Sequence, residues 1–322
     1  MSDPAEWMPW TREVPADVAG CVGVDLVELR QLAVELAIDG ALLARDGRGA
    51  ALARAGAVDT KSTQTDVVTV MDRAVEERLR GRLAVARPQD AVLGEEAGQH
   101  GRSSLTWVLD PIDGTVNYVY GREEYGVSVA AVLGDPAIPG RWVTVAGAVA
   151  APARGVVFHA HRGGGARCDE IGTVRGDMGG VGAEASGTLS VTSVDDLAVT
   201  LLATGFAYDS DRRVEQAQAL VPVLGQVRDI RRGGSAALDL CAVAAGTVDA
   251  YAERGVHVWD VAAGMLIAAE AGAQVGFWIA GPRAETGVMA ASPGISAPLA
   301  ALMTQAYLDA SHPVEMGEGR VG

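Results

Sequence analysis

Five short apolar segments follow one another between residues 91 and 162, and they constrain the fold more than any other feature of the sequence. They are AVLG at 91, LTWVL at 105, YGVSVAAVL at 125, WVTVAGAVA at 142 and GVVFHAHR at 155. Short apolar runs that are bounded by turn residues are typical of strands. Five strands in direct succession, with no helical pattern between them, predict an antiparallel sheet.

Two helical patterns precede these strands. Residues 24–46 place Leu26, Leu29, Ala33 and Leu36 on a helical repeat, and the pattern stops at Gly47. A second pattern runs from about residue 72 to residue 86, and Pro88 follows its end. We expect both helices to cover one face of the sheet.

The second half of the chain alternates strand and helix patterns, which predicts an α/β lobe. Strands are expected at VTLLATG, QVRDI, VDAYAE, AQVGFWI and GVMAAS, and helices at 214–224, 235–245, 259–271 and 295–308. A Gly-rich stretch at 163–187 lacks a hydrophobic period and predicts a loop or a hairpin excursion. The predicted organisation is a loosely attached arm at 1–22, an N-terminal lobe at 23–193, an α/β lobe at 194–312 and a tail at 313–322.

Composition excludes several functional classes. The formal net charge is −15, which disfavours direct nucleic-acid binding because such binding depends on a basic surface. The three cysteines are too few and too scattered for a disulfide framework or a zinc site, which favours a reducing compartment. No apolar leader or membrane-length apolar run is recognisable, so we expect a cytoplasmic protein with no membrane contact.

Acidic residues stand at the edges of several predicted elements. Asp72 begins the second helix, Glu95 follows AVLG, Asp110 and Asp113 follow LTWVL, and Asp260 begins the helix at 259–271. Each residue alone has a structural explanation, because Asp caps helices and Asp-Pro-Gly stretches form turns. Together they supply the carboxylate oxygens with which proteins hold Mg²⁺ beside a substrate phosphate.

The pair Gly114-Thr115 adds an anion-binding feature. If a helix starts after Asp113, the free amides of this pair point outward and can bind a phosphate oxygen. Metal ligands and an anion pocket within six residues indicate metal-assisted hydrolysis of a phosphate ester.

Four motifs, in this order, closely resemble the inositol monophosphatase family, in particular its SuhB-type bacterial branch. They are TKSTQTDVVTVMD, LGEEAG, WVLDPIDGTVNYVYG and WDVAAGMLIAAEAGA, and the resemblance extends from the first helix to the last. The pairing of DPIDGTxN with WDxAAG is highly specific. The resemblance implies an α/β class fold, a layered α/β/α/β/α sandwich shared with fructose-1,6-bisphosphatase, and hydrolysis of a phosphate monoester, inositol 1-phosphate first.

The resemblance also implies a set of Mg²⁺ ligands. Glu95, Asp110 and the backbone carbonyl of Ile112 match the ligands of a first ion. Asp110, Asp113 and Asp260 match those of a second ion, so Asp110 would bridge the two. A weaker third ion would lie near Glu95, which gives two to three ions per site.

Other residues match catalytic and substrate-binding positions of the family. Asp72 and Thr115 match the pair that helps deprotonate the nucleophilic water, and Lys61, the only lysine among 26 basic residues, matches a lysine near that pocket. Glu253 matches the acid that accepts hydrogen bonds from substrate hydroxyls. The remaining positions expected to bind substrate are Gly114, Thr115, Gly234, Ser235, Ala236 and Asp260.

The choice of substrate stays open within this resemblance. Fructose 1,6-bisphosphate, histidinol phosphate and 3′-phosphoadenosine 5′-phosphate are alternatives, the last the least favoured because the sequence shows no obvious basic cluster for a second phosphate. Glu253 favours a polyol. Inhibition by Li⁺ and a homodimer are expected, and bacterial members can also act as accessories of transcription complexes.

Overall fold

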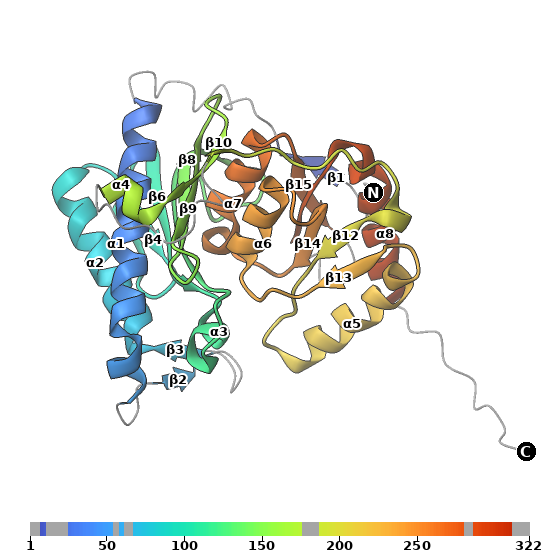
Figure 1. Ribbon diagram of the computed structural model, residues 1–322, viewed down its shortest axis with the longest axis horizontal. Coiled ribbons are helices and arrows are strands. Elements are labelled where there is room, and N and C mark those ends of the chain that lie inside the picture. Colours follow the sequence, from blue (N-terminus) through green and yellow to red (C-terminus); the bar gives the residue numbers. More distant parts are fainter. Residues whose placement is uncertain are drawn as a thin grey trace, which may run out of the picture.

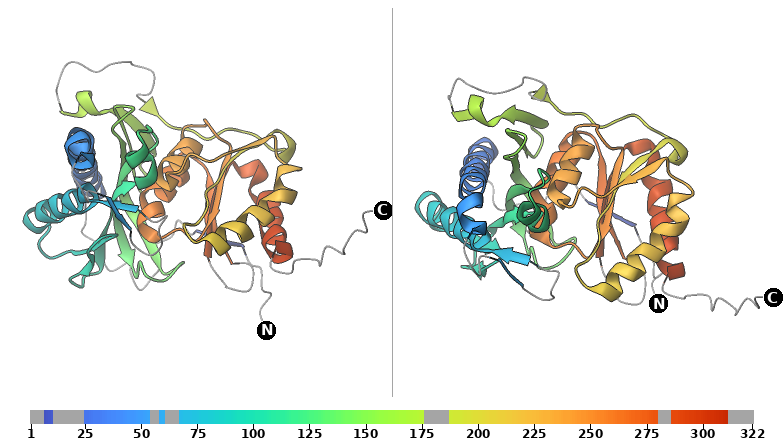
Figure 2. Two further views of the ribbon diagram at one scale, coloured as in Figure 1. Left: turned by 90° about the horizontal axis from the view of Figure 1, so that it is seen from below. Right: turned by 60° about the horizontal axis from the view of Figure 1, so that its bottom comes forward.

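The computed structural model describes residues 7–10, 25–53, 58–60, 67–175, 187–279 and 286–310, and these form five stacked layers (Figures 1 and 2). The outer layer holds α1 (Leu26–Leu52) and α2 (Val70–Ala86), and an eight-stranded sheet follows. The middle layer holds α6 (Ala236–Ala244) and α7 (Val258–Glu270). A six-stranded sheet comes next, covered by α5 (Ser210–Leu224) and α8 (Pro293–Ala310). The predicted α/β/α/β/α sandwich is confirmed.

The eight-stranded sheet contains all five predicted strands. Its order is β11 (Gly187–Thr188), β10 (Ala166–Glu170), β9 (Val156–His161), β8 (Trp142–Ala151), β7 (Gly126–Gly134), β6 (Leu105–Asp113), β4 (Ala91–Gly94) and β5 (Gly98–His100). The predicted antiparallel pairing has one exception, because β4 and β6 are parallel. The reason is the unpredicted strand β5, which folds back along the outer side of β4, so the chain reaches β6 from the far edge.

The Gly-rich stretch at 163–187 is partly a hairpin. Its strand β10 pairs antiparallel with β9, as the hairpin alternative predicted, and the short helix α4 (Ile171–Arg175) follows. Residues 176–186 lie outside the described part of the chain.

The six-stranded sheet confirms the alternating pattern of the second half. Its order is β1 (Trp7–Pro9), β15 (Gln274–Ile279), β16 (Thr286–Ala291), β14 (Ala250–Arg254), β12 (Leu201–Ala203) and β13 (Asp229–Arg231). The smaller elements are β2 (Val58–Thr60), β3 (Val67–Thr69), α3 (Thr115–Tyr120) and η1 (Leu197–Val199). A lobe boundary near residue 193 stays a prediction.

Residues 7–10 correct the prediction of a loosely attached arm. Strand β1 pairs antiparallel with β15, with Trp7 opposite Trp278, so it becomes an edge strand of the six-stranded sheet. Trp10 is buried, and the guanidinium of Arg162 lies 5.0 Å from the centre of its ring. The burial of the indole ring outweighs the polar character of the surrounding sequence. Residues 1–6 and 11–24 and the predicted tail lie outside the described residues.

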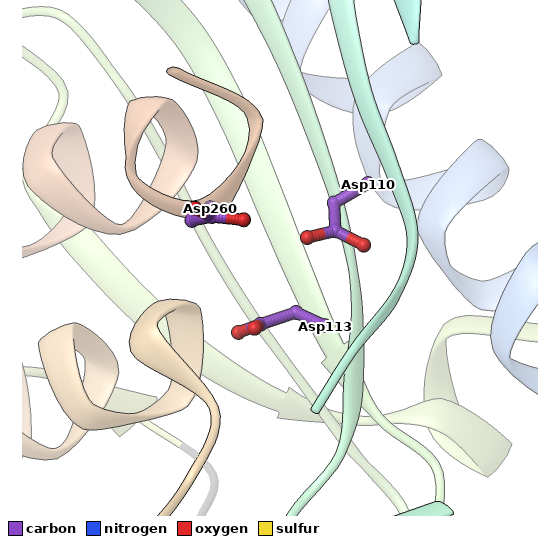
Figure 3. Close-up of side chains that lie close together, drawn as sticks. All are labelled: Asp110, Asp113 and Asp260. Carbon is purple, nitrogen blue, oxygen red and sulfur yellow. The ribbon is translucent and has the colours of Figure 1, made fainter. Parts of the chain in front are cut away.

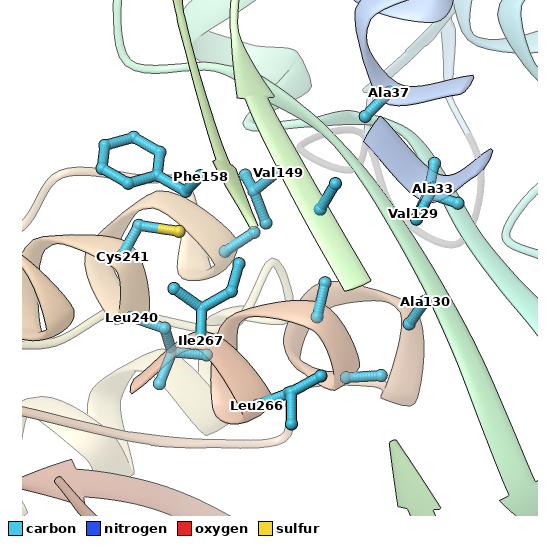
Figure 4. Packing of buried hydrophobic residues seen from close by; sticks show 14 of the residues in the cluster. Ala33, Ala37, Val129, Ala130, Val149, Phe158, Leu240, Cys241, Leu266 and Ile267 are labelled. Atoms are coloured by element: carbon cyan, nitrogen blue, oxygen red, sulfur yellow. The ribbon is translucent and has the colours of Figure 1, made fainter. Parts of the chain in front are cut away.

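The main apolar core lies on both faces of the eight-stranded sheet (Figure 4). Ala33 and Ala37 of α1 pack against one face, and Leu266 and Ile267 of α7 pack against the other. Alanines on α1 let the helix approach the sheet closely. A second cluster around Trp278 fills the space between the six-stranded sheet and helices α5 and α8.

Helix α1 continues past the predicted end at Gly47. Its N-cap is Asp25, whose side chain accepts hydrogen bonds from the amides of Val27 and Glu28, and the helix ends at Leu52. Gly47 is not a terminator, because the helix continues to Leu52. A Cβ atom at Gly47 would lie 2.8 Å from the end of the Met71 side chain, so the glycine leaves room for that side chain.

Cys168 and Cys241 carry free thiols in the core, and burial raises the pKa of Cys168 to about 11. These two thiols are accordingly unreactive at neutral pH. Cys21 lies outside the described residues. Among the helices of the described residues, none combines the length and apolar character needed to cross a bilayer.

Candidate active site

Three carboxylates converge where strand β6 ends and helix α7 begins (Figure 3). Asp110 and Asp113 lie on β6, in a segment where the pairing with β7 shifts register by a β-bulge. Asp260 projects from the first turn of α7 toward them. One oxygen from each carboxylate lies within 4.8 Å of the others. The bulge matters because residues three apart on a regular strand face opposite sides, whereas here both Asp side chains face α7.

The electrostatics of this cluster are unfavourable for three free carboxylates. Burial raises the pKa of Asp110 well above its usual range, and the charges of Glu95, Asp113 and Asp260 raise it further. Burial, with the charge of Asp260 next, raises the pKa of Asp113 to about 7. Burial and the charge of Glu95 raise the pKa of Asp260 to about 8. A divalent cation would relieve this repulsion, and the oxygen-only donor set suits Mg²⁺.

Asp113 is held in place by the start of helix α6. Its Oδ2 atom accepts hydrogen bonds from the Ser235 hydroxyl at 2.5 Å and from the Ala237 amide at 2.7 Å. Ser235 is also the N-cap of α6, where its Oγ accepts a hydrogen bond from the Leu238 amide. Ser235 thus orients a carboxylate of the cluster, and its predicted contact with substrate stays a prediction.

Asp260 and Glu95 approach the pocket from two other elements. Asp260 accepts a hydrogen bond from the His257 amide at 2.6 Å, a capping interaction that fixes its side chain at the start of α7. Glu95 follows β4 and lines the same pocket. Its charge acts on Asp110 and Asp260, although its carboxylate does not join the group of three within 4.8 Å.

Thr115 and Asp72, the two residues expected to act on the nucleophilic water, contact each other through a hydrogen bond. The chain turns into helix α3 at Thr115, as expected from the sequence. The Thr115 hydroxyl lies 3.2 Å from Oδ1 of Asp72 and 2.9 Å from the carbonyl oxygen of Ile112. One hydroxyl proton therefore serves two acceptors, and Asp72 is fully buried behind it.

A pocket of about 290 Å³ opens beside the cluster. The predicted site residues that line it are Glu95, Asp110, Ile112, Asp113, Gly114, Thr115, Gly234, Ala236, Glu253 and Asp260. Asp72 and Ser235 are not part of the lining and act through their hydrogen-bond partners. Lys61 lies outside the described residues.

Glu253 lies on the pocket wall at the end of β14. Its Oε2 atom accepts a hydrogen bond from the Tyr251 hydroxyl at 3.0 Å. Burial raises the pKa of Glu253 to about 7, the Tyr251 hydrogen bond lowers it in part, and the charge of Asp239 raises it. The carboxylate is a hydrogen-bond acceptor set apart from the cluster, as a polyol-binding acid would need to be.

The pocket also contains basic residues that the sequence analysis missed. Arg212 from α5 and Arg232, close before α6, are among its lining residues. Burial raises the pKa of Glu253 and of Asp239 to about 7, and the positive charge of Arg232 offsets part of each increase. Arg232 adjoins the GGSAA segment already expected at the site, so its position could have been inferred. No local pattern in the sequence pointed to Arg212. The presence of Arg212 and Arg232 in the pocket weakens the argument against a substrate with a second phosphate.

Comparison with known proteins places this site in a family. The model of the inositol monophosphatase family matches residues 25–307. The inositol-1-monophosphatase SuhB of Mycobacterium tuberculosis is 47% identical over 291 residues, which cover 85% of this chain and 93% of that protein. The Nus factor SuhB of Xylella fastidiosa is 38% identical over 217 residues, covering 67% and 70%. A solved structure of Mycobacterium tuberculosis SuhB superposes with a TM-score of 0.70 at 42% identity, covering 88% of this chain and 98% of that one. The chain therefore belongs to the inositol monophosphatase family.

Proposed function

We propose that the protein is a Mg²⁺-dependent phosphate monoester hydrolase that acts on inositol 1-phosphate. The observation that carries this proposal is the cluster of Asp110, Asp113 and Asp260, whose oxygens lie within 4.8 Å of one another beside the pocket. Buried carboxylates at this spacing repel one another when they are ionised, and a bound cation offsets that repulsion.

The donor set fits two neighbouring ions. Glu95, Asp110 and the carbonyl of Ile112 would hold the first, and Asp110, Asp113 and Asp260 the second, with a weaker third near Glu95. Mg²⁺ bound by these oxygens supplies positive charge that stabilises the attacking and leaving oxygens of the phosphate ester. The amides of Gly114 and Thr115 are proposed to orient the phosphate at the start of α3.

Asp72 and Thr115 are proposed to move the proton. Thr115 lines the pocket, Asp72 does not, and the two side chains are hydrogen-bonded, so a proton from water can pass to Oγ1 of Thr115 as its own proton passes to Oδ1 of Asp72. Such a pair keeps the acid away from solvent while letting it act on the reacting water.

A panel of phosphate esters tests the proposal. Phosphate release should be fastest from inositol 1-phosphate, should require Mg²⁺, should stop when EDTA removes it, and should be inhibited by Li⁺. Fructose 1,6-bisphosphate is the second candidate, because Arg212 and Arg232 could bind its other phosphate. Histidinol phosphate and 3′-phosphoadenosine 5′-phosphate complete the panel. Equal release with and without Mg²⁺ would rule out the proposed mechanism.

Glu253→Gln is expected to change substrate preference rather than chemistry. A charged acceptor that loses its donors costs about 1.5–3 kcal/mol, which corresponds to a roughly tenfold to hundredfold loss of discrimination. We therefore expect kcat/KM for inositol 1-phosphate to fall by that factor, with little change for p-nitrophenyl phosphate, which has no ring hydroxyls.

The pH of this measurement matters. Since the pKa of Glu253 is raised to about 7, its carboxylate is fully ionised only above that pH. The difference between wild type and Glu253→Gln should therefore be larger at pH 8 than at pH 6. An unchanged ratio of the two kcat/KM values at pH 8 would mean that Glu253 does not contact the polyol.

An accessory role in a transcription complex is the alternative from another class, and some relatives carry the name Nus factor SuhB. Pull-down experiments with wild type and an Asp110→Asn variant separate the two functions. Partners retained equally by both proteins would indicate a second function that does not need the metal site. A homodimer and a cytoplasmic location also stay proposals.

A further inference from the structure

Glu76 is a buried acid that the proposed reaction does not use. It lies on α2 and is only 1% exposed. Its Oε2 accepts a hydrogen bond from the Glu96 amide at 2.7 Å, and its Oε1 accepts one from the Ala97 amide at 3.0 Å. One carboxylate therefore binds two successive amides of the turn that directly follows Glu95.

Arg80 completes this contact one helical turn further along α2. Its Nε donates to Oε1 of Glu76 at 2.7 Å, and another nitrogen of its guanidinium donates to the carbonyl oxygen of Gly98. The ion pair is largely shielded from water, with side-chain exposures of 19% for Arg80 and 2% for Glu76. Charge-assisted hydrogen bonds in such surroundings are strong and directional.

The residue before Glu95 is fitted to the same carboxylate. A Cβ atom on Gly94 would lie 2.3 Å from Oε1 of Glu76, so only glycine permits this approach. The amide of Glu95 itself donates to the Leu109 carbonyl of β6 at 3.3 Å. Glu76 thus holds the backbone that follows Glu95 and packs against Gly94 before it, while the amide of Glu95 is hydrogen-bonded to the strand that carries Asp110.

Helix α2 connects two parts of the site through this arrangement. Asp72 and Glu76 are four residues apart on α2, so they share a helix face. Asp72 contacts Thr115, and Glu76 contacts the turn after Glu95. A rigid helix therefore sets the position of the proton acceptor relative to that of Glu95.

We propose that Glu76, supported by Arg80, is a positioning residue that holds the Glu95 carboxylate toward the carboxylate cluster and so sets the affinity for Mg²⁺. The proposal rests on the proposed function, in which Glu95 is a ligand. A Gln side chain at position 76 has one acceptor oxygen, whereas the amides of Glu96 and Ala97 each donate to one oxygen of Glu76. The NH₂ group of Gln would face one of these N–H groups, and that hydrogen bond would be lost. The turn then shifts, and Glu95 with it.

The test measures Mg²⁺ binding by titration calorimetry, with no substrate present. Loss of an outer partner of a metal ligand costs about 10- to 100-fold in metal affinity, so the Kd of Glu76→Gln should rise by that factor. At saturating Mg²⁺, kcat should return to within a few-fold of wild type. Glu77→Gln is the matched control, because it makes the same chemical change at the next, exposed position of α2. Its Kd should equal that of wild type.

A conservative variant separates positioning from general stability. Glu76→Asp keeps the charge but withdraws it by one methylene, so its Kd should fall between those of wild type and Glu76→Gln. Glu76→Asp also decides the matter if circular dichroism shows that Glu76→Gln does not fold. An unchanged Kd in a folded variant at position 76 overturns the proposal. A wild-type protein that binds no Mg²⁺ instead refutes the proposed function, so the two failures are distinguishable.

Discussion

Replacement of Asp110 by Asn is expected to lower kcat/KM for inositol 1-phosphate by about a thousandfold or more, because metal ions contribute several kcal/mol to the transition state and each 1.36 kcal/mol is tenfold. Asp110 is the acid proposed to be shared by both ions, so one lost charge weakens both. The Asn Oδ1 atom can still accept the hydrogen bond from the Ile112 amide, which keeps the local backbone in place.

The same substitution should stabilise the protein when Mg²⁺ is absent. The folded-state pKa of Asp110 is raised, so its favourable contribution is present at acidic pH and is lost as pH rises through that pKa. As pH rises, the folded wild type therefore bears the cost of keeping Asp110 either protonated or charged beside the other acids, and Asn removes this cost. In EDTA, the Tm of Asp110→Asn should exceed that of wild type by about 1–2 °C for each kcal/mol of destabilisation removed. The difference should shrink toward pH 5.

Asp135→Asn is the control for both measurements. Asp135 is exposed and directly follows the last residue of β7. The carboxylate cluster lies at the other end of this strand, where Gly126 pairs with Asp113. Asp110 pairs with Ser128 and Asp113 with Gly126, so seven to nine strand residues place Asp135 roughly 24–30 Å from these two acids. Its activity and Tm should match wild type. Near-normal turnover by Asp110→Asn at saturating Mg²⁺ would contradict the bridging assignment.

The carboxylate cluster could be predicted because each acid stands at the edge of an element that hydrophobic periodicity identifies. β6 and α7 have strong apolar patterns, so the positions of Asp110, Asp113 and Asp260 relative to these elements followed directly. The contact between distant parts of the chain did not follow from periodicity. It came from the family resemblance, since local patterns carry no information about which element ends meet.

The elements that were missed are those whose structure depends on distant partners. β5 has the sequence GQH and no apolar pattern, and only its pairing with β4 makes it a strand. β1 is an edge strand because β15, from the other end of the chain, presents a free edge to it. Gly47 was predicted to end the first helix, whereas α1 continues to Leu52 and the glycine lies against the end of the Met71 side chain. In each case tertiary contacts outweigh local propensity.

The roles of Ser235 and Glu76 illustrate the same limit at the site. Ser235 was expected to touch substrate, which stays a prediction, and the structure shows that it is buried and orients Asp113. Glu76 belongs to none of the motifs in the sequence, and only the structure shows its carboxylate on the turn after Glu95. Sequence motifs identify groups at the reacting centre, whereas residues that orient those groups have few local signals.

Asp72→Asn should lower kcat by about a hundredfold to ten-thousandfold, which is the usual contribution of a general base. Asn keeps an oxygen that can accept the Thr115 hydrogen bond, but it cannot take up a proton. Because Asp72 does not line the pocket, the Kd for Mg²⁺ should stay near that of wild type, in contrast to Asp110→Asn. The measurements are kcat at saturating Mg²⁺ and calorimetric Mg²⁺ binding in parallel.

A double-mutant cycle with Thr115 shows whether the two residues act as a unit. Thr115→Val removes the hydroxyl that lies 3.2 Å from Asp72, and Thr115→Ser retains it, so the serine variant should keep most of the activity. If the proton passes along this hydrogen bond, loss of either member interrupts the same path, and the double variant Asp72→Asn/Thr115→Val should be little slower than the slower single variant. Multiplying effects would mean that the two residues act separately. In that case the Thr115 hydroxyl would serve mainly its other acceptor, the Ile112 carbonyl at 2.9 Å, and a second residue would have to accept the proton from water.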